Sequence, residues 1–316
     1  MNYSPICIFI YNRREKVISL LNSLFLCEEF KHSPIYVFSD GAKNNDPIDK
    51  VNVIKTRAIL KSMLKGFNVK YFFREENLGL AKSICYGVTE VLKSNDSVVV
   101  FEDDLIVDKS ILKFFNYFLT ELKNFSNVFQ ISGHLFFDTN KEIGPSNFYM
   151  SCTNSWGWAT WSDSWNNFDY NYLMGKKMKL NKKQIQKFNL NNSYNFNKIL
   201  NRQYSGRVNS WAILWYLTVF LNNGLVLYPN RTLVLNKGLD GTGTHTLLEE
   251  YQSDFSSIEV LLNLPSLMNS ENESSKKVMR FMKKHISKNI FQKVFFKLKN
   301  YKQWKNIFLM VSYLQL

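Results

Sequence analysis

Apolar and polar residues alternate along the first half of the chain in blocks of two different periods. Short apolar runs rich in Val, Ile, Phe and Tyr predict buried β-strands, and longer stretches with apolar residues three and four apart predict amphipathic helices. The strands are expected at 4–11, 34–41, 68–75, 96–104 and 128–136, and the helices between them at 14–27, 51–66, 77–94 and 108–124. This alternation predicts an α/β fold with a mostly parallel, Rossmann-like sheet and helices on both faces.

Polar residues follow each of the first four predicted strands at the point where the strand ends. In chain order they are Tyr11-Asn12-Arg13-Arg14, Asp40-Gly41, Arg74-Glu75 and Glu102-Asp103-Asp104. Taken singly, each is also typical of a solvated turn, a surface arginine or a core tyrosine. Because the carboxyl ends of parallel strands share one edge, where such sheets bind their ligands, together they predict a single site.

The acidic trio Glu102, Asp103 and Asp104 directly follows the apolar run VVVF. Carboxylates that are unpaired at the end of a buried strand are costly and repel one another, so a positive partner is expected. The glycine pattern G-x-G-x-x-G and a phosphate-loop lysine are both absent after the first strand. Their absence disfavours an ordinary NAD domain or a nucleoside triphosphatase.

Composition limits the possible classes of protein. The 316 residues are 45% apolar and 16% aromatic, which favours a folded α/β domain with elaborations over a disordered chain. The spacing of Cys7, Cys27, Cys85 and Cys152 predicts reduced thiols rather than a metal or disulfide framework. We expect neither a signal peptide nor a transmembrane helix, since the apolar runs 212–221 and 307–316 are too short to span a bilayer.

The net charge of +14 is concentrated at one end of the chain. Residues 274–316 carry eleven Lys and Arg and no acid, which leaves +3 for the rest and argues against nucleic-acid binding by the globular part. Apolar residues recur every four positions in this tail: Val278, Met282, Ile286, Ile290, Val294 and Leu298. The pattern is typical of a basic helix lying on an anionic membrane, or of a helix docked on the core with lysines outward.

Aromatic residues cluster in NSWGWATWSDSW, at 154–165. The spacing of Trp158, Trp161 and Trp165 fits one packed helix face. Flat aromatic rings beside a glycine also suit the apolar face of a sugar ring, so both interpretations stay open. Residues 171–206 are rich in Lys and Asn. We interpret them either as a partly helical acceptor lobe or as a low-complexity, solvent-exposed segment.

Residues 1–150 resemble the nucleotide-sugar-binding half of GT-A glycosyltransferases. The similarity lies in YNR, SDG, NLGLAKS and EDD at the strand ends and helix start. Residues 151–273 resemble the acceptor-binding and catalytic half of bacterial surface-polysaccharide sugar transferases of the family 2 or N-acetylglucosaminyltransferase I type. The matching segments are 154–165, NSWAILW at 209–215, and the stretch ending in DGTGTH at 222–245. Residues 274–316 form the basic amphipathic tail.

The resemblance implies a metal-dependent enzyme that uses a UDP-sugar with Mn²⁺ or Mg²⁺. Asp104 would ligate the metal, with His245 as a further ligand or diphosphate contact. The resemblance and the strand-end positions together assign the donor site to Tyr11, Asn12, Arg13, Asp40, Gly41, Arg74, Asn77, Lys82, Glu102 and Asp103. The acceptor or sugar platform would comprise His134, Trp156, Gly157, Trp158 and Trp211.

The catalytic base departs from the pattern that this resemblance implies. An inverting transferase needs a carboxylate to take the acceptor proton, and the family motif D-S-W-A-I reads here with Asn209 in first place. An amide cannot accept that proton, and Leu214 stands where Arg is common. The base would then be Asp163, Asp169 or Asp240, or the enzyme would be impaired.

These features predict an inverting glycosyltransferase that extends a glycan or lipid-linked glycan of a bacterial surface polysaccharide. We expect it in the cytoplasm, bound peripherally to the inner face of the plasma membrane through its tail. One alternative is a non-catalytic or impaired homologue that binds nucleotide sugar or membrane, for which Asn209 is the main argument. Another is a nucleotidyltransferase, although its Gly-rich first loop is missing.

Overall fold

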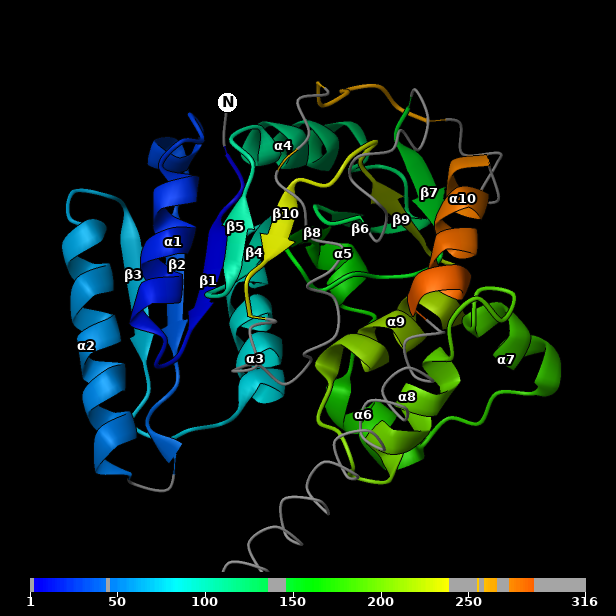
Figure 1. Cartoon of the computed structure of the whole chain (residues 1–316), viewed down its shortest axis with the longest axis horizontal. Helices are drawn as coiled ribbons and strands as arrows, with labels where there is room; N and C mark the ends of the chain where they lie inside the picture. Colours follow the sequence, from blue (N-terminus) through cyan, green and yellow to red (C-terminus); the bar gives the residue numbers. More distant parts are fainter. Residues whose placement is uncertain are drawn as a thin grey trace, which may run out of the picture.

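The computed structural model describes residues 3–43, 46–135, 146–238, 255, 259–265 and 273–286. An eight-stranded mixed sheet runs through the described part, with helices on both of its faces, and a short two-stranded sheet lies beside it (Figure 1). Asp240 and His245 lie outside the described residues, so their predicted roles stay predictions.

The first half of the chain alternates strand and helix as its hydrophobic pattern predicts. The elements are β1 (Ile6–Ile10), α1 (Arg14–Leu24), β2 (Ile35–Ser39), α2 (Pro47–Met63), β3 (Val69–Phe73), α3 (Leu80–Leu92), β4 (Ser97–Glu102), β5 (Leu105–Val107), α4 (Ile111–Glu121) and β6 (Val128–Ser132), with the 3-10 turn η1 (Phe30–His32) between α1 and β2. The short strand β5, directly after the acidic trio, was not predicted.

The second half supplies the remaining strands and a helical lobe. Its elements are β7 (Phe148–Met150), β8 (Trp158–Trp161), α5 (Ser162–Trp165), α6 (Tyr170–Lys176), α7 (Lys182–Phe188), α8 (Phe196–Tyr204), α9 (Trp211–Leu221), β9 (Leu225–Tyr228), β10 (Val234–Asn236), α10 (Glu273–Phe281) and the π-helical turn η4 (Met282–Ile286). Residues 171–206 thus contain three helices, and α8 packs against α9.

The sheet has the order β3-β2-β1-β4-β8-β6-β9-β7. The first four strands in this order are mutually parallel, which confirms the predicted parallel, Rossmann-like sheet for that part. Strand β8 runs antiparallel between β4 and β6, and β7 is antiparallel to β9. The carboxyl ends of β1, β2, β3, β4 and β6 therefore lie at one edge, and the loop that enters β8 reaches the same edge.

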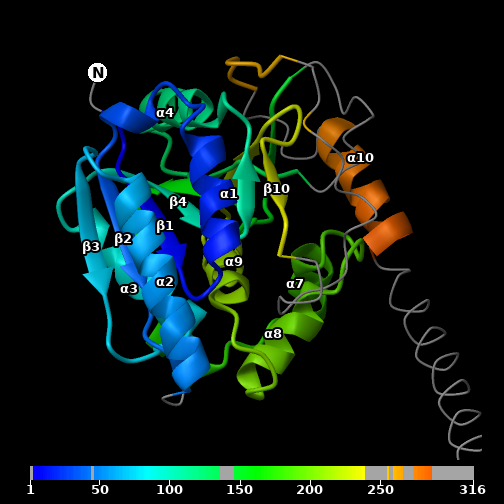
Figure 2. The same ribbon diagram turned by 60° about the vertical axis from the view of Figure 1, so that its left-hand side comes forward.

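Side chains of β1 alternate between two hydrophobic cores, one on each face of the sheet. Ile6, Ile8 and Ile10 join the core beneath α1, α2 and α4. Cys7 and Phe9 join the core that contains α3 and α9. Figure 2 shows α1 and α2 side by side over one face of the sheet. Cys27 and Cys152 are buried too and Cys85 is half-buried, and all four thiols are free, as predicted.

The helix α10 docks on the core instead of lying apart from it. Val278 and Met282, on the predicted apolar face, are 1% and 3% exposed, and α10 contacts β7. These two side chains are therefore not available to a membrane, and the docked interpretation holds for this part of the tail; residues 287–316 lie outside the described part. Among the described residues, no helix has the length and hydropathy needed to cross a membrane.

Candidate active site

The acidic trio meets its positive partner in Arg13. Strand β4 ends at Glu102, and the neighbouring strand β1 leads into the turn that carries Arg13. The Arg13 guanidinium binds the Asp103 carboxylate through one nitrogen and lies 3.0 Å from Asp104 Oδ2 through the other. Asp103 also accepts a hydrogen bond from the backbone N–H of Tyr11 at 3.2 Å. The sequence predicted that these groups lie at one edge of the sheet, which the parallel pairing of β1 and β4 confirms. It did not predict the ion pair, because Arg13 was assigned to the donor and the positive partner of the trio was expected to be a metal ion.

One guanidinium does not balance three carboxylates. Burial, followed by the charges of Asp104 and Asp103, raises the pKa of Glu102 to about 8. Burial likewise raises the pKa of Asp103 to about 6, even though Arg13 opposes the shift. At neutral pH the Glu102 carboxyl therefore tends to keep its proton, and a cation bound beside the trio would favour its ionised form.

The residues present suit a divalent cation that takes part of its ligands from a bound substrate or from water. Within the described residues, no group of three or more His, Cys, Asp or Glu is arranged to hold a metal ion alone. Mg²⁺-type ions are commonly held by one or two carboxylates plus substrate phosphates and water, so a complete protein cage is not required. Carboxylate oxygens are also the donor type that Mg²⁺ and Mn²⁺ prefer.

The segment that follows β10 packs against Asp104. Strand β10 pairs with β5, and the backbone N–H of Lys237 donates to the carbonyl of Asp104 at 2.8 Å. A Cβ on Gly238 would lie only 2.2 Å from Asp104 Oδ2, so any larger residue here would force the Asp104 carboxylate to move. The described chain reaches the trio at Gly238, two residues before Asp240.

A second charged cluster joins the ends of β2 and β3. Arg74 Nη1 lies 3.0 Å from Asp40 Oδ1 and 2.8 Å from Ser83 Oγ. Nη2 of Arg74 is buried and has no hydrogen-bond partner among the described residues, which leaves a donor unmatched. A Cβ on Gly41 would lie 2.0 Å from the carbonyl oxygen of Glu75, so this glycine lets the two strand-end loops touch.

Arg57 on α2 fixes the backbone beneath that cluster. Its guanidinium donates to Ser39 Oγ at 2.9 Å and to the carbonyl oxygens of Ser39, Asp40 and Arg74 at 3.2, 3.0 and 2.6 Å. Sequence reasoning missed Arg57, because a lone arginine on a predicted helix carries no signal of what it contacts.

Asp49, also on α2 and also missed from the sequence, gathers the loops after β1 and β2. Its carboxylate accepts hydrogen bonds from Tyr11 Oη, from Asn12 Nδ2 at 2.6 Å, and from the backbone N–H of Lys43 at 2.7 Å. Burial alone would raise the pKa of Asp49, but these three hydrogen bonds outweigh burial and the pKa lies below the ordinary value. Asp49 is therefore held as a carboxylate among its three donors.

Two predicted donor-site residues lie at the start of α3, Asn77 just before the helix and Lys82 in its first turn. Asn77 Nδ2 donates to the Gly41 carbonyl at 2.8 Å, and its Oδ1 accepts from Gly79 N–H at 3.1 Å. Asn77 therefore ties the α3 entrance to the β2 loop. Lys82 is exposed in the first turn of α3, where the positive end of the helix adds to its charge.

His134 and Gly157 position β10. The Nδ1 of His134 lies 3.0 Å from the Val234 carbonyl, which only accepts, so Nδ1 carries the proton in this contact. Gly157 has φ +62°, and a Cβ there would lie 2.7 Å from Val234 Cγ2. Burial lowers the pKa of His134 to about 4. Of the predicted sugar platform, Trp156 is partly exposed and packs against the His134 ring with centroids 4.5 Å apart.

Trp158 and Trp211 belong to the core, which corrects their predicted role as a sugar platform. Their side chains are 0% and 3% exposed, and their ring centroids lie 5.2 Å apart. Trp165 packs with them at the start of the helical lobe. The prediction that Trp158, Trp161 and Trp165 share one helix face is also wrong, because Trp158–Trp161 is a strand and Ser162–Trp165 is a separate short helix.

The three described candidates for the catalytic base have different surroundings. Asn209 is exposed just before α9, and its Oδ1 accepts a hydrogen bond from Tyr170 Oη at 2.9 Å. Asp169 caps α6 by accepting from Tyr172 N–H. Asp163 follows the end of β8 that pairs with Ser97, so it lies at the edge of the sheet opposite Asp104. This position removes Asp163 from the candidate site.

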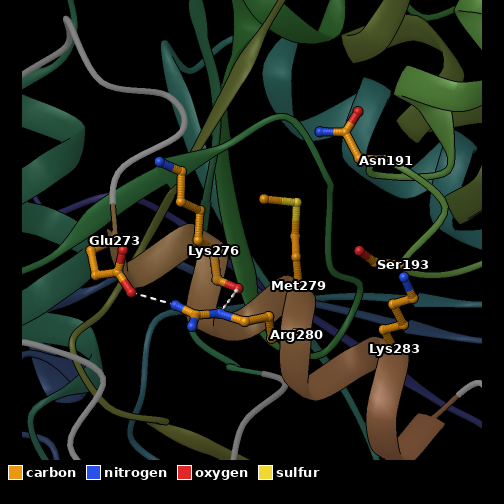
Figure 3. Close-up of a pocket in the computed structure, with 7 residues that line it drawn as sticks. All are labelled: Asn191, Ser193, Glu273, Lys276, Met279, Arg280 and Lys283. Carbon is orange, nitrogen blue, oxygen red and sulfur yellow. Dashed lines mark hydrogen bonds and ion pairs between the residues drawn. The ribbon is translucent and has the colours of Figure 1, made fainter.

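Two cavities lie away from the candidate site. One, of about 470 Å³, is formed by α10 and the Asn191–Ser193 turn (Figure 3). It is lined by Lys276, Met279, Arg280, Lys283 and Glu273, and the last of these is paired with Arg280. The other, of about 690 Å³, lies along the polar side of α8. No strand-end residue lines either cavity, so neither extends the site.

Comparisons with known proteins find similarity in three-dimensional structure but none in sequence. No protein-family model matches the chain, and no curated protein matches it in sequence. Among solved structures, S. aureus TarS 1–349 in complex with UDP-GlcNAc is 13% identical, with a TM-score of 0.46 over 79% of this chain and 63% of that one. Galactosyltransferase LgtC with donor and acceptor sugar analogs is 15% identical, with a TM-score of 0.39 over 71% and 72%. GalNAc-T7 with UDP, GalNAc and Mn²⁺ is 9% identical, with a TM-score of 0.46 over 74% and 44%.

Proposed function

We propose that the protein is a GT-A-type glycosyltransferase that moves a sugar from a nucleotide diphosphate, with UDP as the nucleotide, to a glycan acceptor. One observation carries the proposal: polar and charged side chains from the ends of four parallel strands meet at one edge of the sheet, around three adjacent acidic residues in which burial and neighbouring charge raise the pKa of Glu102 to about 8. The strand-end motifs that resemble nucleotide-sugar enzymes point to the same ligand.

Each cluster at this edge has a part in holding the donor. Tyr11 offers a flat ring to a pyrimidine, and Asp40 offers a carboxylate to its N–H. The unmatched buried donor of Arg74 would be satisfied by an oxygen of the nucleotide after a small side-chain shift. Asp103 and Glu102 would face the ribose, and Lys82 with the start of α3 would favour the diphosphate.

Asp104 would hold the divalent cation between protein and diphosphate. Its Oδ2 lies at 3.0 Å from Arg13 and beside Gly238, so the side chain is held at the rim of the trio. When bound, Mg²⁺ or Mn²⁺ would neutralise charge on the departing diphosphate. Arg13 would hold Asp103 throughout, which keeps the carboxylates together in the absence of donor.

Inversion at the sugar carbon needs a carboxylate base, and Asp240 is the remaining candidate. Asn209 is an amide, Asp169 caps a helix and Asp163 lies at the opposite edge of the sheet. Asp240 follows by two residues Gly238, which packs on Asp104. We further propose a glycan of a bacterial surface polysaccharide as acceptor, on the cytoplasmic side, as the motifs of the second half imply.

The direct test is release of UDP from a panel of UDP-sugars in the presence of Mn²⁺. Slow hydrolysis of one UDP-sugar, lost in Asp104→Asn, would support the proposal even before the acceptor is known. Absence of both turnover and nucleotide binding across UDP-, GDP-, ADP- and CMP-sugars would refute it.

A binding-only homologue is the second candidate, and Asn209 favours it. If Asn209 occupies the place of the base, Asn209→Asp should gain about 10²–10⁴-fold in turnover, the usual contribution of general-base catalysis. A slower Asn209→Asp enzyme would show that the base is another residue. UDP binding without transfer in either protein, to any glycan acceptor tried, would favour the binding-only function.

A further inference from the structure

Asp49 lies where a buried carboxylate would be costly without several donors. It sits in the first turn of α2 and is 9% exposed. Its two oxygens accept from three donors that come from two different loops: Tyr11 and Asn12 after β1, and Lys43 after β2. Each of these loops follows a strand that ends at the candidate donor site.

The helix does not need Asp49 as a cap. Asp46 already caps α2, because its side chain accepts from the backbone N–H groups of Ile48 and Asp49. An acid at this third helical position often reaches back to the N–H of the capping residue. Here that N–H of Asp46 donates to the Lys43 carbonyl at 2.9 Å instead, so the Asp49 carboxylate is available to the two loops.

The contacts of Asp49 fix the orientation of one aromatic ring. Tyr11 Oη donates to Asp49 and accepts from the Lys43 N–H at 3.1 Å, so the phenol is held at both its donor and its acceptor site. The Lys43 ammonium lies 5.5 Å from the centre of the same ring. A ring held in this way loses little rotational freedom when a flat ligand stacks on it, so binding costs less.

We propose that Asp49 is a positioning residue for the base-binding end of the donor site: it holds Tyr11 and the β1 and β2 loops in the arrangement that accepts a nucleoside base. The inference rests on the proposed function, because that function assigns the base to Tyr11. It predicts that Asp49 controls affinity for the base and leaves affinity for the diphosphate unchanged.

The test compares two ligands that share the diphosphate and of which only one carries a nucleoside. UDP and inorganic pyrophosphate, each with Mn²⁺, are titrated into wild type, Asp49→Asn and Asp46→Asn by calorimetry. Asp49→Asn should weaken UDP about tenfold, as expected when a charge-assisted hydrogen bond is lost, with pyrophosphate affinity unchanged. Asp46→Asn removes the same charge from the same helical turn, and Asn caps helices as well as Asp does, so it should change neither affinity.

Tyr11→Phe keeps the ring and removes the hydroxyl that binds Asp49, so it tests the inference if Asp49→Asn fails to fold. It should also weaken UDP and leave pyrophosphate unchanged. Equal losses for both ligands, or no loss in either variant, would overturn the inference while UDP binding by wild type keeps the proposed function standing. If wild type binds no nucleotide diphosphate at all, both the proposed function and this inference fail.

Discussion

Replacing Arg13 with Gln should destabilise the protein far more than the same change at Arg14. Arg13 is the guanidinium shared by Asp103 and Asp104, whose side chains are 4% and 14% exposed. Removing one partner of a buried ion pair commonly costs about 3–5 kcal/mol, and since Arg13 is itself 28% exposed we expect about 3 kcal/mol. Arg14 pairs with the exposed Glu15, so Arg14→Gln should cost below about 1 kcal/mol.

The assay is urea unfolding of both variants and wild type at pH 7.5 and at pH 5. The Arg13→Gln deficit should shrink at the lower pH. Burial already raises the pKa of Glu102 and Asp103, so protons can neutralise these carboxylates where the guanidinium is missing. Equal free energies of unfolding for the two variants at pH 7.5, or a deficit that grows at pH 5, would refute this reasoning.

Three further changes test other parts of the site. Burial lowers the pKa of His134 to about 4, below the unfolded value of about 6.5. The neutral His134 therefore contributes up to about 3 kcal/mol of stability above pH 6.5, and this contribution is lost as the pH falls toward 4. His134→Asn should flatten that part of the pH–stability curve, and an unchanged curve would contradict the assignment. Gly157→Ala should lower the free energy of unfolding in urea by about 2–4 kcal/mol, because the residue has a positive φ and the new Cβ would clash with Val234. A loss below about 1 kcal/mol would show that β10 shifts easily. Arg57→Leu should weaken UDP binding measured by calorimetry, because Asp40 and Arg74 lose the donor that fixes their backbone; unaltered affinity would show that the two loops hold their own geometry.

The parts of the site that follow strands could be predicted from the sequence. A strand ends where its apolar run meets Asp40, Arg74 or Glu102, and parallel pairing then brings those residues to one edge. This argument needs only local pattern and one rule of topology. It explains why the acidic trio and Arg13 could be assigned to one edge before the structure, although their ion pair could not be predicted.

Residues whose contacts depend on tertiary packing could not be predicted in the same way. Asp49 and Arg57 lie two turns apart on α2, and nothing in their spacing says which strand-end loops they reach. Trp158 was ambiguous because a tryptophan at helical spacing also fits a strand followed by a turn. Its burial follows from the insertion of β8 between β4 and β6, a long-range pairing that local periodicity does not encode.

The proposed function depends most directly on whether Asp104 couples UDP binding to a divalent cation. The measurement is the dissociation constant of UDP at pH 7.5, with and without Mn²⁺, for wild type and Asp104→Asn. We expect Mn²⁺ to tighten UDP binding to wild type by at least about tenfold, which is about 1.4 kcal/mol, and to give no such gain in Asp104→Asn. Mn²⁺-independent UDP binding by wild type, or an equal gain in the variant, would contradict the account.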